Sequence, residues 1–194
     1  MQRIAGVDVA RGLAVLGMVA AHVGDDSAPG AGWLIVTHGR SAATFATLAG
    51  LSIALLSGGP QPRALGLARR RVATRAVLLA LIGVLLMALG TPVAVILPSY
   101  ALMFLLVLPA MGWSRRALLI AAAIVLSLGA PLWASFDERP TGLPLSLLVG
   151  RFYPAVVWPA YLLVGLALGR SELRSWRTRA VLGLGGAALV VIGY

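Results

Sequence analysis

The sequence predicts an all-α protein, a polytopic bundle of transmembrane helices. Of its 194 residues, 60% are hydrophobic and 11% are charged, and the mean hydropathy is +0.95. A soluble domain averages about 25% charged residues, so this chain has too few polar side chains to cover a surface exposed to water. Six apolar runs also approach the roughly 20 residues that a helix needs to cross a bilayer. No internal repeat or linker divides these runs, so we expect residues 1–194 to form one transmembrane domain.

Six full spans are predicted, and a seventh run is shorter. The spans are Val7–Val23, Ser41–Leu56, Arg75–Leu89, Val93–Met111, Ala117–Leu132 and Phe152–Leu168. The seventh run, Ala180–Tyr194, reaches the end of the sequence after a length of only about 22 Å as a helix. It is either a short span packed within protein or the sign of an N-terminal part of a longer protein. We favour the second interpretation.

The distribution of arginines predicts the orientation. All 16 basic residues are arginines, and most fall in the N-terminus and in three connections that share one side: Arg3, Arg63, Arg69, Arg70, Arg71, Arg75, Arg115, Arg116, Arg170, Arg174, Arg177 and Arg179. The opposite side carries Arg40, Arg139 and Arg151. Positive residues mark the cytoplasmic side, so the N-terminus is expected inside. Asp25, Asp26, Asp137, Glu138 and both histidines then lie outside.

The composition of the chain argues against several kinds of ligand and site. Because the arginines mark topology, the net charge of +10 does not indicate nucleic-acid binding. The chain has no cysteine, so it has no disulfide and no thiolate ligands. Two histidines and six acidic residues are too few and too scattered to predict a metal site. A cleaved signal peptide at the N-terminus is disfavoured, because Asp8 and Arg11 interrupt its apolar run.

The first span carries three polar residues on one side. At about 100° per residue, Asp8, Arg11 and His22 fall within an arc of about 60°, which we call the polar stripe. Charged residues in a span usually face the bundle interior or a wet cavity. We expect an ion pair between Asp8 and Arg11, with His22 about 21 Å away at the outer end. The stripe either fixes helix packing or lines a path for anions and protons.

The segment Thr37–Ser41 places His38 and Arg40 on the same outer side as His22. Histidine titrates near neutral pH and is a natural general base, and Arg40 could hold an oxyanion. A solvated loop is the alternative interpretation. The span that follows has small residues at every fourth position, Ala42, Ala46, Gly50 and Ala54, which predicts close packing against a neighbour, plausibly the first helix.

Aromatic residues gather at the start of the sixth span. Phe152, Tyr153 and Trp158 are typical of an aromatic belt at the membrane interface. Alternatively, the same three side chains form the wall of a site for a sugar or lipid acceptor. Prolines in or near the spans, Pro98, Pro109, Pro154 and Pro159, predict breaks or kinks. The cluster Arg69–Arg71 is expected to anchor anionic lipid or, as a second possibility, to hold the nucleotide of coenzyme A.

Three segments carry a resemblance to a known family. RIAGVDVARGLAVLGMVAAH (Arg3–His22), HGRSAATFATLAGLSIAL (His38–Leu55) and FYPAVVWPAYLLVGLALGR (Phe152–Arg170) resemble the heparan-alpha-glucosaminide N-acetyltransferase-like membrane proteins and their uncharacterised bacterial multi-pass relatives. The D-x-x-R-G motif at Asp8–Gly12 is the most specific part. The other spans resemble the family only in hydropathy.

The resemblance implies a transmembrane acyltransferase. Such an enzyme takes an acetyl or other acyl group from cytosolic acyl-coenzyme A, most commonly acetyl-coenzyme A. It delivers the group to a glycan or amino-sugar acceptor across the membrane. The family's active histidine lies outside the first helix, and His38 matches it best. Because Gly39–Ser41 stands where the family has Trp-Asn-Gly, and His22 stands where the animal enzyme has Asn, either histidine remains a candidate.

Together these observations predict an acyltransferase of the bacterial cytoplasmic (inner) membrane. The expected donor site includes Arg11 and the cluster Arg69, Arg70 and Arg71. The expected catalytic residues are His38 and His22, with His38 either deprotonating the acceptor or carrying the acyl group. Arg40, Tyr153 and Trp158 are expected to bind a glycan or lipid-linked sugar. Membrane lipid and a second copy in a homodimer are the other expected partners. The alternatives are a proton-coupled transporter of a small molecule or lipid that uses the polar stripe, and a non-catalytic membrane scaffold.

Overall fold

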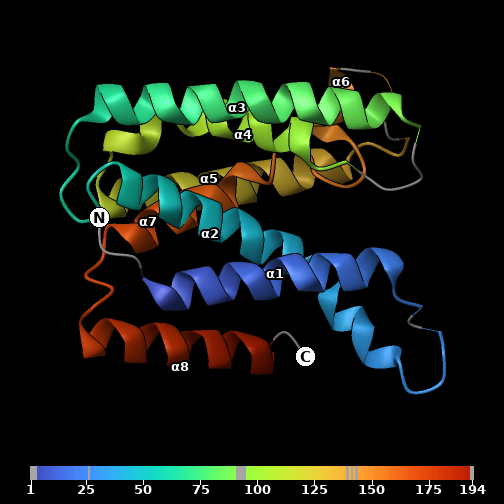
Figure 1. Cartoon of the computed structure of the whole chain (residues 1–194), viewed down its shortest axis with the longest axis horizontal. Helices are drawn as coiled ribbons and strands as arrows, with labels where there is room; N and C mark the ends of the chain where they lie inside the picture. Colours follow the sequence, from blue (N-terminus) through green and yellow to red (C-terminus); the bar gives the residue numbers. More distant parts are fainter. Residues whose placement is uncertain are drawn as a thin grey trace.

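The chain folds into a bundle of helices that run back and forth along one direction (Figure 1). The computed structural model describes residues 4–25, 27–90, 95–138, 140, 142 and 144–192, and every regular element within them is helical. The elements are α1 (Ala5–Val23), η1 (Gly32–Thr37), α2 (Arg40–Leu56), α3 (Leu65–Ala88), α4 (Leu97–Val107), η2 (Pro109–Gly112), α5 (Arg115–Ala134), α6 (Leu145–Val149), α7 (Pro159–Gly169) and α8 (Trp176–Ile192). Arg3, Asp26, Arg139, the start of a predicted span at Val93 and the end of the seventh run at Tyr194 lie outside the described residues.

Only some of the predicted spans are long enough to cross a membrane. Four stretches of the described residues have the length and hydropathy required: Ala5–Val23, Gly32–Leu56, Leu65–Ala88 and Arg115–Ala134. The fourth and sixth predicted spans are instead the short helices α4 and α7, of 11 residues each. Prolines stand at helix boundaries here: Pro98 is in the first turn of α4, Pro109 lies just beyond its end, and Pro159 begins α7.

The third helix begins earlier than hydropathy predicts. It starts at Leu65, ten residues before the predicted Arg75, after a left-handed Ala64 with φ of 49°. Arg69, Arg70 and Arg71 therefore lie on a helix rather than in a connection. Arginine is a good helix former, and the apolar run that follows continues the same helix, so the charges do not end the helix.

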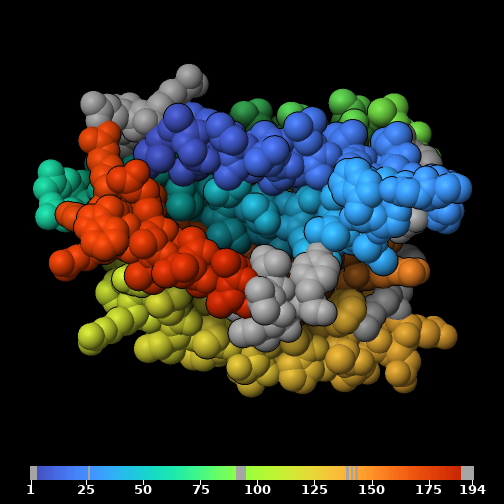
Figure 2. All heavy atoms as spheres, turned by 90° about the horizontal axis from the view of Figure 1, so that it is seen from below, coloured from blue at the N-terminus to red at the C-terminus, as the bar shows by residue number. Residues whose placement is uncertain are grey.

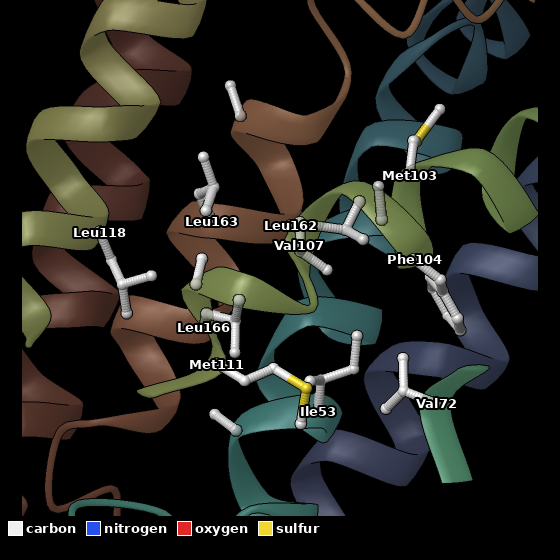
Figure 3. Close-up of a cluster of buried hydrophobic side chains, with 14 of the residues drawn as sticks. Ile53, Val72, Met103, Phe104, Val107, Met111, Leu118, Leu162, Leu163 and Leu166 are labelled. Atoms are coloured by element: carbon white, nitrogen blue, oxygen red, sulfur yellow. The ribbon is translucent and has the colours of Figure 1, made fainter. Parts of the chain in front are cut away.

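The core forms where α2, α3, α4, α5 and α7 meet (Figure 3). Its fully buried side chains include Met103, Met111, Leu118, Leu162 and Leu166. The small residues of α2 pack against α7, and not against α1 as expected. A Cβ added at Gly50 would meet the backbone of Leu162, and one added at Gly165 would meet that of Thr47. The two backbones therefore touch, as small residues permit between helices in lipid.

Helices α1 and α8 lie at the periphery. Helix α1 packs on α2 and η1, and Ala14 is its one buried residue among those described. At this contact Gly17 lies against the side chain of Ser41. Figure 2 shows α1 and α8 on one face of the molecule, with α2 visible between them.

The alternating helices separate the arginines by end. The α2–α3, α4–α5 and α7–α8 connections lie together at the left of Figure 1, and the other connections lie at the right. The first group carries the arginine clusters, and we call its side the Arg-rich end. That this end faces the cytoplasm stays a prediction from the positive-inside rule.

A buried arginine joins three elements at the Arg-rich end. Arg170, which caps α7, is 8% exposed and donates hydrogen bonds to the carbonyl oxygens of Gly59 and Met111 and to the hydroxyl of Ser57. These groups belong to the turn after α2 and to η2. Burial lowers the pKa of the guanidinium from its ordinary value. Arg170 therefore fixes the connections around it.

Candidate functional site

The polar stripe of α1 does not face the bundle interior as a unit. Arg11 is half-buried and donates a hydrogen bond to the hydroxyl of Ser52 on α2, while Asp8 and His22 are exposed. The side of α1 that contacts α2 is centred on Ala14, so the stripe lies on the flank of the contact. Within the described residues the expected ion pair between Asp8 and Arg11 does not form, because Arg11 turns toward Ser52 instead.

Arg11 enters a cavity that four helices share. The Arg11 cavity has a volume of about 460 Å³. Its lining comes from α1 to α4 and the residue before α4: Arg11, Phe45, Ala49, Ser52, Ile53, Arg75, Leu79, Ile96, Leu97, Tyr100 and Phe104. Among the described residues, the lining holds the guanidinium groups of Arg11 and Arg75 and no carboxylate. Tyr100 stacks obliquely on Phe45 and Phe104, with ring centroids 5.6 and 5.8 Å apart, and its buried hydroxyl has no hydrogen-bond partner among the described residues.

The two histidines lie at the end opposite the Arg-rich end (Figure 1). His22 is in the last turn of α1, where its ring Nδ1 donates to the carbonyl oxygen of Met18 at 2.7 Å. His38 is exposed and directly follows η1. Gly39 then takes a φ of 69°, which glycine adopts without strain, and turns the chain into α2. His38 therefore lies in the tight turn between η1 and α2.

The predicted acceptor residues also belong to this end. Arg40 is the first residue of α2 and is exposed. The rings of Tyr153 and Trp158 meet edge to face at 5.1 Å, and Trp158 lies 5.3 Å from Tyr161. These three aromatic side chains pack partly against the core, whereas Phe152 is 60% exposed. The exposure of Phe152 is what an aromatic belt at the membrane interface predicts. Tyr153, Trp158 and Tyr161 instead form a cluster that packs against the core.

The arginine cluster on α3 divides into different environments. Arg69 donates to the carbonyl oxygens of Leu108 at 3.1 Å and Pro109 at 3.4 Å, which joins α3 to the end of α4. Arg70 and Arg71 are exposed on the first turns of α3. Within the described residues Arg11 makes no hydrogen bond to this cluster, because its guanidinium donates to the hydroxyl of Ser52. The predicted donor residues therefore do not form one contact group.

Sequence reasoning missed several residues that the fold brings together. Ser52, Arg75 and Tyr100 line the Arg11 cavity from three different helices, and Arg170 organises the Arg-rich end. The sequence marks Arg75 and Arg170 as topology signals, and Arg170 also closes the segment Phe152–Arg170 that resembles the family. The sequence offers two signals for the cavity: Arg11 in the first span, which is expected to face the interior or a wet cavity, and the polar Tyr100 inside an apolar run. No group of three or more metal-ligating side chains occurs within the described part of the chain.

Comparison with known proteins gives a family match that covers nearly the whole chain. The family model described as heparan-alpha-glucosaminide N-acetyltransferase, catalytic, matches residues 3–192. This range contains the polar stripe, both histidines, the Arg11 cavity and the aromatic cluster. No curated protein and no solved structure matches the chain significantly.

Proposed function

The chain belongs to the heparan-alpha-glucosaminide N-acetyltransferase catalytic family, and from this premise we propose that it is an acyl-coenzyme A-dependent acyltransferase of the bacterial inner membrane. The family indicates a membrane transferase, and four apolar helices agree with a membrane protein. The observation that carries the proposal is the family match over residues 3–192. The donor is acetyl-coenzyme A or another acyl-coenzyme A, and the acceptor is an extracytoplasmic glycan or amino sugar.

The donor approaches from the Arg-rich end. Exposed Arg70 and Arg71 can bind its phosphates bidentately in water, where the desolvation cost of a multiply charged nucleotide is small. Arg69 already donates to two carbonyl oxygens, and Arg11 is bonded within its cavity. We therefore assign the nucleotide to Arg70 and Arg71.

His38 is the proposed general base at the other end. The acceptor's hydroxyl or amine attacks the thioester carbonyl, a new C–O or C–N bond forms, and the C–S bond breaks. His38 takes the acceptor's proton, and the thiolate of coenzyme A leaves and is protonated. His22 assists from α1, and Arg40 with Tyr153 and Trp158 holds the acceptor. The lipid bilayer and a second copy of the chain are the proposed partners.

Acyl transfer in reconstituted vesicles tests the proposal. Labelled acetyl-coenzyme A is supplied on one side, and transfer to glucosamine and to lipid-linked sugars is measured. We expect His38→Ala to lower the rate by about 100-fold or more, as loss of a general base does. His22→Ala should cost less, and Thr44→Ala, an exposed substitution on the first turns of α2, should have no effect.

Full activity in both histidine variants would refute the proposed mechanism. No transfer by the wild-type chain, together with solute uptake driven by a pH gradient, would favour a proton-coupled transporter instead. Loss of stability without either activity would favour a scaffold.

A further inference from the structure

The two guanidinium groups of the Arg11 cavity lack a charge partner. Arg11 bonds only to the neutral hydroxyl of Ser52, which itself donates to the carbonyl oxygen of Leu48 at 2.6 Å. Arg75 is exposed and has no hydrogen-bond or ion-pair partner among the described residues, and none of the described lining residues is a carboxylate. A charge in apolar surroundings is costly unless it is compensated. The half-buried guanidinium of Arg11 therefore has no compensating charge among the described residues.

We propose that the Arg11 cavity binds one anionic lipid of the surrounding membrane, with its phosphate on Arg11 and Arg75 and an acyl chain along the apolar wall. Arginine is suited to phosphate because its planar guanidinium donates two parallel hydrogen bonds. The cavity volume of about 460 Å³ lies within the range of roughly 300–1,000 Å³ that is typical of ligand sites.

The lining separates a charged end from an apolar end. Ser52 lies seven residues after Phe45 on α2, about 10 Å nearer the Arg-rich end. On α3, which runs the opposite way, Leu79 lies about 6 Å beyond Arg75 and away from that end. Ile96 and Leu97 stand at the start of α4, at the far end of the cavity. This order matches the order of groups in a lipid, with the headgroup at the membrane boundary and the chain toward its centre.

The surroundings favour a lipid over a water-soluble ligand. The apolar run of α3 begins at Arg75, so this residue marks the membrane boundary at the Arg-rich end. Neighbouring side chains on the two flanking helices are exposed and apolar, among them Leu78 and Ile82 on α3 and Val15 on α1. Exposed apolar side chains of this kind suit contact with the hydrocarbon of a bilayer, which would place the cavity beside lipid. The buried hydroxyl of Tyr100 supplies a further donor beside the cavity.

Lipid retention by the purified full chain tests this inference without reference to acyl transfer. The protein is released from nanodiscs of equal parts phosphatidylglycerol and phosphatidylcholine with identical chains, and bound lipid is measured by native mass spectrometry. The wild type is expected to retain phosphatidylglycerol in preference. Arg11→Leu and Arg75→Leu should each weaken this retention by about 10- to 100-fold, as loss of a charged hydrogen bond does.

Two control variants separate the site from general surface charge. Arg116→Leu removes an exposed arginine at the same end that does not line the cavity, so it should leave retention unchanged. Ala49→Leu fills the cavity while keeping both arginines, so it should reduce retention. Because Arg11→Leu removes an uncompensated charge, the variant should still fold, which thermal unfolding checks.

Three results would overturn the inference. Retention could be unchanged in Arg11→Leu and Arg75→Leu, or Arg116→Leu could reduce it equally. Alternatively, added palmitoyl-coenzyme A could displace phosphatidylglycerol in an Arg11-dependent way, which would assign the cavity to an acyl donor. None of these results depends on whether His38 catalyses acyl transfer.

Discussion

Replacing Gly165 with alanine tests whether the contact between α2 and α7 holds the bundle together. A Cβ at this position would lie 1.9 Å from the carbonyl oxygen of Thr47 and 2.8 Å from the backbone nitrogen of Leu51. Ordinary contact requires 3.4 Å or more, so the helices must separate by about 1.5 Å. Backbone atoms cannot rotate out of the way as a flexible side chain can.

The expected cost follows from packing. Inserting a methyl group into a packed interface costs about 1–3 kcal/mol, and the rigid backbone acceptor places this case at the upper end. Opening a gap of 0.5–1 Å already loses about a quarter to a half of a dispersion contact, and α2 and α7 supply much of the core. The better helix propensity of alanine returns about 0.5–1 kcal/mol. We expect a net loss of about 2–3 kcal/mol in the free energy of unfolding.

Thermal unfolding in detergent, followed by circular dichroism, measures this loss. At about 2–4 °C per kcal/mol for a chain of this size, Tm should fall by about 4–12 °C. Gly66→Ala is the matched control, because Gly66 is exposed in the first turn of α3 and an added Cβ meets nothing within 4 Å. Its Tm should stay equal or rise slightly. If Gly165→Ala were as stable as Gly66→Ala, the packing argument would be wrong.

Three further outcomes are expected. Arg170→Lys keeps the charge but cannot reach three acceptors at once, so it should lower the free energy of unfolding by about 2–5 kcal/mol, whereas Arg177→Lys, at an exposed position, should change Tm little. Tyr100→Phe removes a buried hydroxyl that has no described partner, so Tm should be unchanged or higher; a clear fall would show a hydrogen bond to that hydroxyl. The hydroxyl and backbone N–H of Ser27 donate to Asp25 and hold the pKa of its carboxyl below the ordinary value, so Ser27→Ala should raise that pKa in an NMR titration, and an unchanged pKa would contradict the assigned cause.

Several features of this protein were determined by the sequence alone. Composition and run length identified a helical membrane protein, and the segments around Asp8–Gly12 and His38 pointed to the family that the comparison then showed. The four-residue spacing from Ala42 to Ala54 predicted a closely packed face on α2. Each of these signals is local, because helix periodicity and hydropathy depend on residues that are neighbours along the chain.

Only the tertiary structure decided which faces meet. The small face of α2 packs on α7, more than 100 residues away in sequence, and not on the adjacent α1. Arg11 bonds to Ser52 rather than to Asp8, one turn away on its own helix. The Arg11 cavity likewise takes its lining from α1 to α4. A single sequence shows that a helix has an apolar or polar face, but the partner of that face depends on how the whole bundle excludes lipid and fills space.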